Sequence, residues 1–246
     1  MALGVLLTVT LLSISWSLWI RRVTWHCRWE VAATLNIARQ GCAVALMSPL
    51  ASATLGVALH HLTGKWNIED YIGHDCYIVA ASAIVYNALG RLADDEAMQA
   101  SFKKFVELPA TLCIPLLLTT FSLGNGGKVY RPDFFTIPTD FWLSTYWLLL
   151  CGTLAYLLGF GMRALLVLRR DPRSRRIANV YLFASVSGIM ACVVRTSTAV
   201  VTPLQGPVGV GLVWLFACSC GTVFALASAH AWRQKVKWFQ RPLLPR

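Results

Sequence analysis

The chain has 246 residues, of which 57% are hydrophobic and 13% charged, and its mean hydropathy is +0.58. Soluble domains contain about a quarter charged residues, so this composition excludes an ordinary soluble domain and indicates a membrane protein. The net charge of +11 would favour nucleic-acid binding in a soluble chain. Here membrane insertion and contact with anionic lipid explain it, so we expect no nucleic-acid partner.

Seven apolar stretches approach the length of about 20 residues that a helix needs to cross a bilayer. They are residues 1–20, 41–59, 76–92, 108–123, 141–162, 177–194 and 208–229. The connections between them are too short for a further domain. We therefore predict a single all-α domain over residues 1–246, a polytopic membrane protein with seven transmembrane helices.

The basic residues predict the orientation of these spans. If the amino terminus lies outside, 18 of the 22 lysine and arginine residues fall on the cytoplasmic side. The four that remain outside are Lys65, Lys128, Arg131 and Arg195. Because cytoplasmic loops are enriched in basic residues, we expect the amino terminus outside and the carboxyl terminus in the cytoplasm. We expect a protein of the bacterial plasma membrane, encoded by a bacterium or by its phage.

Three features along the chain refine this outline. Pro49 lies within the second stretch, where proline kinks a transmembrane helix. Residues 91–107 carry acidic residues first and lysines later, an order typical of a short cytoplasmic helix. The fourth stretch contains Pro115, so we expect it to be broken or tilted.

The connection between the second and third stretches is rich in potential ligands. His60 and His61 end the second stretch, and His74 and Asp75 open the third. Imidazole and carboxylate groups bind zinc, copper and iron, so a metal ion and a metal-dependent enzyme on the outer face form one hypothesis. The favoured alternative is that these groups solvate the membrane boundary. We expect no other cofactor.

The interior of the predicted spans lacks the groups that drive active transport. No aspartate, glutamate or lysine lies near the middle of any span. Such residues mark proton relays and ion paths, so we expect neither a proton-coupled pump nor a carboxylate-dependent antiporter, and no intramembrane aspartyl protease. Kinked helices can still open space for a neutral solute, and we place that candidate pocket near Pro49, Asn87 and Pro115.

Two short motifs carry a family resemblance. Residues 47–50 read Met-Ser-Pro-Leu, and residues 62–67 read Leu-Thr-Gly-Lys-Trp-Asn. With the histidine that opens the third stretch, they are similar to motifs of an uncharacterised actinobacterial family of seven-span transporters. The resemblance is confined to the membrane part of that family and implies transport.

The leading hypothesis is therefore a small transporter-like bundle without enzymatic activity. The alternative is a membrane-embedded interaction or regulatory protein, either a subunit of a larger complex or a factor that excludes phage. An inner cluster of basic residues supports this alternative, because it can bind anionic lipid, a membrane protein partner or a second copy of the chain. The cluster consists of Arg169, Arg170, Arg173, Arg175 and Arg176.

Overall fold

The computed structural model describes residues 2–28, 30–92, 94–201 and 205–239, and this part of the chain is helical and contains no strand. The α-helices are α1 (Ala2–Ile20), α2 (Val31–Leu46), α3 (Pro49–Ala51), α4 (Val57–Thr63), α5 (Ile68–Leu89), α6 (Asp95–Phe102), α7 (Leu108–Leu123), α8 (Phe141–Leu168), α9 (Arg175–Val200) and α10 (Pro207–Phe239). The short 3-10 helices are η1 (Arg22–His26), η4 (Asn125–Gly127) and η5 (Phe134–Thr136), and the π-helical turns are η2 (Ser52–Gly56) and η3 (Lys103–Glu107). The predicted all-α class is confirmed.

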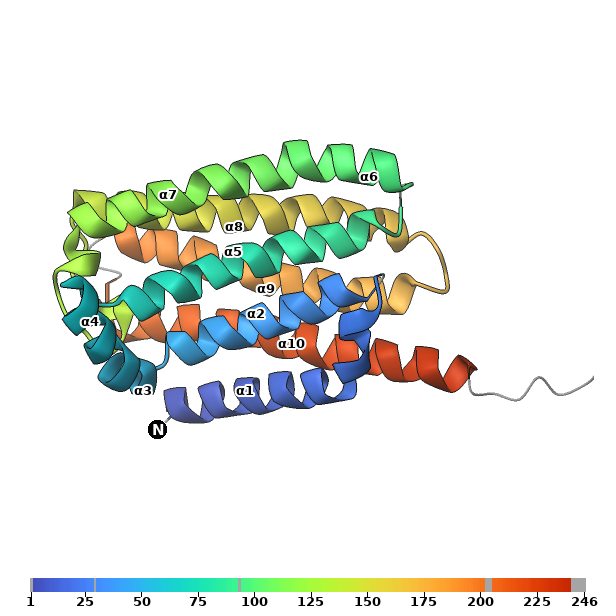
Figure 1. Cartoon of the computed structure of the whole chain (residues 1–246), viewed down its shortest axis with the longest axis horizontal. Helices are drawn as coiled ribbons and strands as arrows, with labels where there is room; N and C mark the ends of the chain where they lie inside the picture. The colour runs from blue at the N-terminus through green and yellow to red at the C-terminus, as the bar shows by residue number, and fades with distance from the viewer. Residues whose placement is uncertain (1, 29, 93, 202–204, 240–246) are drawn as a thin grey trace, which may run out of the picture.

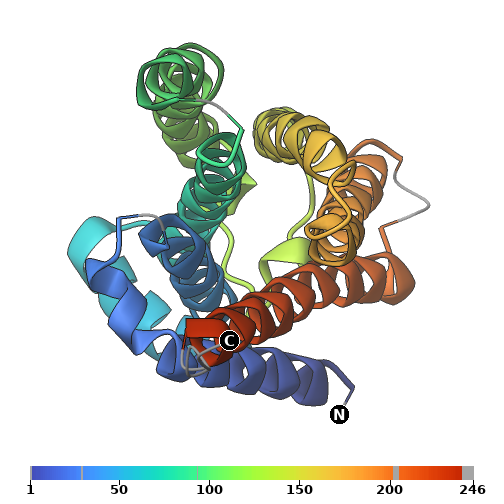
Figure 2. The same cartoon turned by 90° about the vertical axis from the view of Figure 1, so that its right-hand side faces the viewer.

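The long helices run side by side along the longest axis of the molecule (Figure 1). We call the end that holds the start of α1, with α3 and α4, the amino-terminal end, and the opposite end the carboxy-terminal end. Helix α9 packs on α8 and α10, α10 packs on α1 and α2, and α2 packs on α5, which also contacts α7 and α8 (Figure 2). The bundle therefore closes on itself, with the first and last long helices as neighbours.

Within the described residues, five helices are long and apolar enough to cross a membrane. They are α1, the continuous helix Asp95–Leu123, α8, α9 and α10. The pair formed by α2 and the segment Pro49–Thr63 makes a sixth if it is one bent span. The apolar helices are those of a membrane-spanning protein, as the composition predicts.

The second predicted span, residues 41–59, is wrong in its bounds. Helix α2 ends at Leu46, and the next helical segment is turned by 57°. Ser48 is extended, with φ −77° and ψ 148°, because the residue before a proline is pushed out of the helical region. Pro49 then begins α3, so the predicted kink at this proline is confirmed. Arg39, expected in the inner connection, lies within α2.

The prediction of a separate short helix over residues 91–107 is also wrong. Helix α6 begins at Asp95, and the carboxylate of Asp94 caps it by accepting a hydrogen bond from the Ala97 amide at 2.8 Å. The helix then continues through η3 into α7 without a break. The fourth span is therefore longer than the predicted residues 108–123.

Helices α5, α8, α9 and α10 also exceed their apolar stretches, and the extensions of α5 and α9 matter for the interior of the bundle. Helix α5 begins at Ile68 rather than 76, so Glu69, His74 and Asp75 belong to a helix and not to an outer loop. Helix α9 continues past residue 194 to Val200 and carries Arg195 into the bundle. Both extensions bring polar side chains among the packed helices.

Candidate functional site

A cavity of about 90 Å³ lies inside the bundle, and we call it the central cavity. Its walls come from α2, α5, α8, α9, α10 and η5, and they are mostly apolar. Five lining residues matter for its chemistry: His74, Tyr77, Phe135, Trp147 and Arg195. A mostly apolar cavity with a few polar side chains is the usual form of a small-molecule site.

Arg195 is the most unusual residue of the central cavity. It is 3% exposed, and its Nη1 donates to the Phe135 carbonyl oxygen and to Thr198 Oγ1, both at 3.3 Å. The guanidinium lies 4.0 Å from the centroid of the Trp147 ring, in a cation–π contact. Its Nε and Nη2 have no hydrogen-bond partner within the described residues, where the ion pairs involve other cations. A buried charge without an ion pair is costly, which marks this arginine as a functional candidate.

Three more polar atoms on the cavity wall lack partners. His74 is 2% exposed, and its Nδ1 shares a hydrogen bond of 2.7 Å with Tyr146 Oη. Its Nε2, together with Tyr77 Oη and Trp147 Nε1, has no partner among the described residues. Native interiors seldom leave such groups unsatisfied. These three residues and Arg195, which also carries unpartnered atoms, all line the same cavity.

Two other cavities adjoin the central one along the bundle. An outer cavity at the amino-terminal end shares Phe135 and Arg195 with it, and extends to Gln205 and Trp214. An inner cavity toward the carboxy-terminal end shares Ile84 with it, and extends to Asn87. The three cavities therefore follow one another along the long axis, and neighbouring cavities share lining residues.

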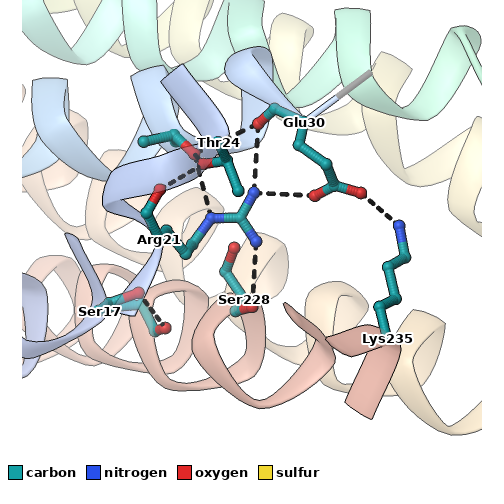
Figure 3. Close-up of polar contacts among 8 residues, drawn as sticks. Ser17, Arg21, Thr24, Glu30, Ser228 and Lys235 are labelled. Carbon is teal, nitrogen blue, oxygen red and sulfur yellow. Dashed lines mark hydrogen bonds and ion pairs between the residues drawn. The ribbon is translucent and has the colours of Figure 1, made fainter. Parts of the chain in front are cut away.

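A second buried polar cluster joins α1, α2 and α10 at the carboxy-terminal end (Figure 3). Arg21, which is 1% exposed, donates from Nε to Thr34 Oγ1 at 3.1 Å and from Nη1 to the Ser228 carbonyl oxygen at 3.2 Å. Its Nη2 lies 2.9 Å from Glu30 Oε2, and the other carboxylate oxygen of Glu30 pairs with Lys235. We call these five residues the Arg21 cluster.

The Arg21 cluster differs from the central cavity because its charges are compensated. Burial favours the neutral acid, but hydrogen bonds from Lys235 and Arg21, together with their charges, outweigh that effect. The pKa of Glu30 therefore lies below its ordinary value of 4.5. A carboxylate that stays ionised and a guanidinium bonded through all three nitrogens form a structural clamp rather than a binding site.

The structure does not bring Pro49, Asn87 and Pro115 together. Pro49 lies at the bend between α2 and α3, and Pro115 is exposed on α7. Asn87 lines the inner cavity near the carboxy-terminal end. The predicted solute pocket therefore has no single location, although one of its residues borders a cavity.

The outer histidines are also separated. His60 stacks on Trp66, with ring centroids 3.6 Å apart, and His61 is exposed. His74 lines the central cavity. Asp75, the next residue in α5, is partly buried. Within the described ranges, no group of three His, Cys, Asp or Glu residues could hold a metal ion.

The five arginines of the predicted inner cluster lie between the end of α8 and the first turn of α9. Arg169, Arg170, Arg173, Arg175 and Arg176 are all exposed. They form a basic surface at the carboxy-terminal end, on the connection between α8 and α9 and the first turn of α9.

Sequence reasoning missed Arg195, Tyr77 and Trp147 as site residues. A usable signal exists for Arg195, because no glycine or proline follows it before residue 202. The helix can therefore continue through the arginine, and an ionisable residue within a membrane helix is a functional hypothesis by default. Tyr77 and Trp147 carry no such signal, since aromatic residues are common in any span.

The fold and the cavities define a class: a membrane-spanning protein, helical throughout its described residues, with a mostly apolar cavity in its bundle that a few polar side chains line. Comparisons with family models, curated proteins and solved structures found no match for this chain.

Proposed function

We propose that this chain is a seven-span membrane protein that carries a small solute through its bundle. In this proposal the spans are α1, α2, α5, α6–α7, α8, α9 and α10. The amino terminus lies outside and the carboxyl terminus in the cytoplasm of a bacterial or phage-carrying cell, at the plasma membrane. The transporter class agrees with the resemblance of residues 47–50 and 62–67 to the actinobacterial family.

One observation carries the proposal: three cavities follow one another along the bundle, and the middle one holds unpartnered polar atoms. A solute held at Arg195 can reach the outer cavity if Phe135 moves. It can reach the inner cavity if Ile84 moves. A central site with a movable wall on each side is what alternating access requires.

Uptake into liposomes tests the proposed function. Purified protein is reconstituted, and entry of labelled glycerol, urea, propionate and propionamide is compared with protein-free liposomes. Ala81, which lines the central cavity and is 4% exposed, is replaced by phenylalanine to fill the space. The control Ala100→Phe places the same side chain at an exposed position on α6.

We expect at least one solute to enter with the wild type and the control, and Ala81→Phe to block it. Because a larger side chain can disturb packing, Ala191→Leu in α9 serves as a second filling variant of the same cavity. Equal uptake by filled and unfilled proteins, or no uptake of any solute, contradicts the proposal.

The seven-span arrangement has a test of its own. Reporter fusions after residues 131, 172 and 237 are expected to lie outside, in the cytoplasm and in the cytoplasm, respectively. Finding the fusions after 131 and 172 in the same compartment would remove α8 as a span. Finding the amino terminus and the fusion after 237 on one side would give an even number of spans.

A further inference from the structure

The unpartnered edge of Arg195 has a defined chemical shape. Its Nε and Nη2 lie on the same side of the planar guanidinium and donate in parallel, while Nη1 already binds Phe135 and Thr198. Two parallel N–H donors match the two oxygens of a carboxylate, which binds arginine in this bidentate way. A single-atom acceptor such as a carbonyl or a halide uses only half of this edge.

Within the described part of the chain, no carboxylate binds that edge. Asp133, the acidic residue whose charge acts on Arg195, accepts a hydrogen bond from Trp214 Nε1 at 3.2 Å instead. Burial raises the pKa of Asp133, although hydrogen bonds from Phe135 and Trp214 and the charge of Arg195 oppose this. Asp133 therefore does not replace an incoming anion as the ion-pair partner of Arg195.

The size and lining of the central cavity limit what such an anion can be. A cavity of about 150 Å³ accepts benzene, so one of about 90 Å³ accepts roughly four non-hydrogen atoms. Most of the remaining lining residues are apolar and come from α5, α8, α9 and α10, among them Ala80, Leu154 and Leu158. The space therefore suits a short apolar tail beside a polar head.

We propose that the central cavity binds a short-chain organic carboxylate, held through its two oxygens by Nε and Nη2 of Arg195, with its alkyl tail against the apolar wall. His74, Tyr77 and Trp147 offer further polar atoms near the head group. The inference rests on the proposed function, because it names the solute class for that same cavity. It adds that the site selects a planar anion over a neutral molecule of equal shape.

Ligand titrations of the purified full chain test this assignment. Sodium propionate is compared with propionamide, which has the same size but no charge, and with sodium chloride, which is charged but not bidentate. Binding is measured by isothermal titration calorimetry and by the rise in unfolding temperature. We expect propionate to bind at least tenfold more tightly than either alternative.

Substitutions locate the binding group. Arg195→Lys keeps the positive charge but loses the two parallel donors, so propionate affinity should fall at least tenfold. The control Arg176→Lys changes an exposed arginine of the same helix and should leave affinity unchanged. Trp147→Phe removes Nε1 and makes the ring system smaller, but it keeps an aromatic ring beside the guanidinium. This variant should lower the affinity for propionate by a few fold. It also provides a second test if Arg195→Lys does not fold.

The outcomes separate this inference from the proposed function. Equal binding of propionamide or chloride, or full propionate affinity in Arg195→Lys, overturns the carboxylate assignment. If a neutral solute enters liposomes and Ala81→Phe blocks it while propionate does not bind, the transport proposal stands and the carboxylate falls. If no solute binds or enters, both are wrong.

Discussion

Replacing Arg21 with methionine tests whether the Arg21 cluster holds α1, α2 and α10 together. The guanidinium is 1% exposed and lies 2.9 Å from Glu30 Oε2. Methionine fills similar space but donates no hydrogen bond. The substitution leaves Glu30 paired with Lys235 alone, and it leaves Thr34 Oγ1 and the Ser228 carbonyl oxygen without their donor.

The expected loss in free energy of unfolding is large. Removing one member of a buried ion pair costs about 3–5 kcal/mol, because the remaining charge is left without compensation. Lys235 still pairs with Glu30, which places the expected loss at the lower limit, about 3 kcal/mol. The assay is titration of purified protein in mixed micelles with sodium dodecyl sulfate, with helix content followed by circular dichroism.

Two controls make the result interpretable. The double variant Arg21→Met, Glu30→Gln should recover about 1 kcal/mol, because the undercompensated carboxylate is gone. Arg195→Met should change stability by less than about 1 kcal/mol. It removes a charge that has no carboxylate partner, and this offsets the hydrogen bonds lost at Phe135 and Thr198. A loss from Arg21→Met no larger than that from Arg195→Met would refute the reasoning.

Three further predictions concern the same stability assay. Because the pKa of Glu30 is lower in the folded chain, its contribution is fully present above pH 4.5 and disappears as pH falls through the folded pKa. The stability difference between wild type and Glu30→Gln should therefore shrink between pH 7 and pH 3, and a constant difference would contradict the shift. Gly56→Ala should lower the free energy of unfolding by about 1–3 kcal/mol, because a Cβ at this position would lie 2.5 Å from Glu69 Oε1. The control Gly152→Ala has open space around the new Cβ and should not lower it. Equal effects of the two glycine substitutions would show that Glu69 yields freely. Asn67→Ala should lower the free energy of unfolding by about 1–3 kcal/mol, since Nδ2 donates to the carbonyl oxygens of Gly126 and Val129 at 2.7 and 2.8 Å. An unchanged unfolding midpoint would mean that other contacts hold the segment containing Gly126 and Val129.

The sequence predicts some helices well because their boundaries coincide with changes of composition. Helix α1 matches the first apolar stretch, which Arg21 ends. Helix α8 begins at Phe141, as predicted, because Asp140 caps it through a hydrogen bond of 2.7 Å from the Leu143 amide. Hydropathy and capping residues are local properties, so a single sequence reveals them.

The bounds of α5 and α9 depend on properties that are not local. Each helix continues through charged residues, and their burial depends on packing against distant segments. Glu69, for instance, is buried, and Ser52 Oγ from the bent segment donates a hydrogen bond to its carboxylate at 2.9 Å. An apolar window cannot include such a residue, so it ends the predicted span too early.

The candidate site was only partly accessible to sequence reasoning for a related reason. The sequence places His74 at the membrane boundary, with metal binding as the second hypothesis, whereas in the structure it lines the central cavity; Asn87 borders the inner one. Which face of a helix lines a cavity depends on how the helix is rotated in the bundle. Spans that are apolar on every side carry little information about that rotation.

The contact between α1 and α10 has a consequence for how the chain is made. Ser17 Oγ donates to the Ala225 carbonyl oxygen at 2.8 Å, although 208 residues separate the two positions. While the ribosome is still translating the middle of the message, Arg21 has only its near neighbours Glu30 and Thr34 as partners. The contact between α1 and α10 can therefore form only after α10 has been synthesised, and a nascent polypeptide released before that point lacks it.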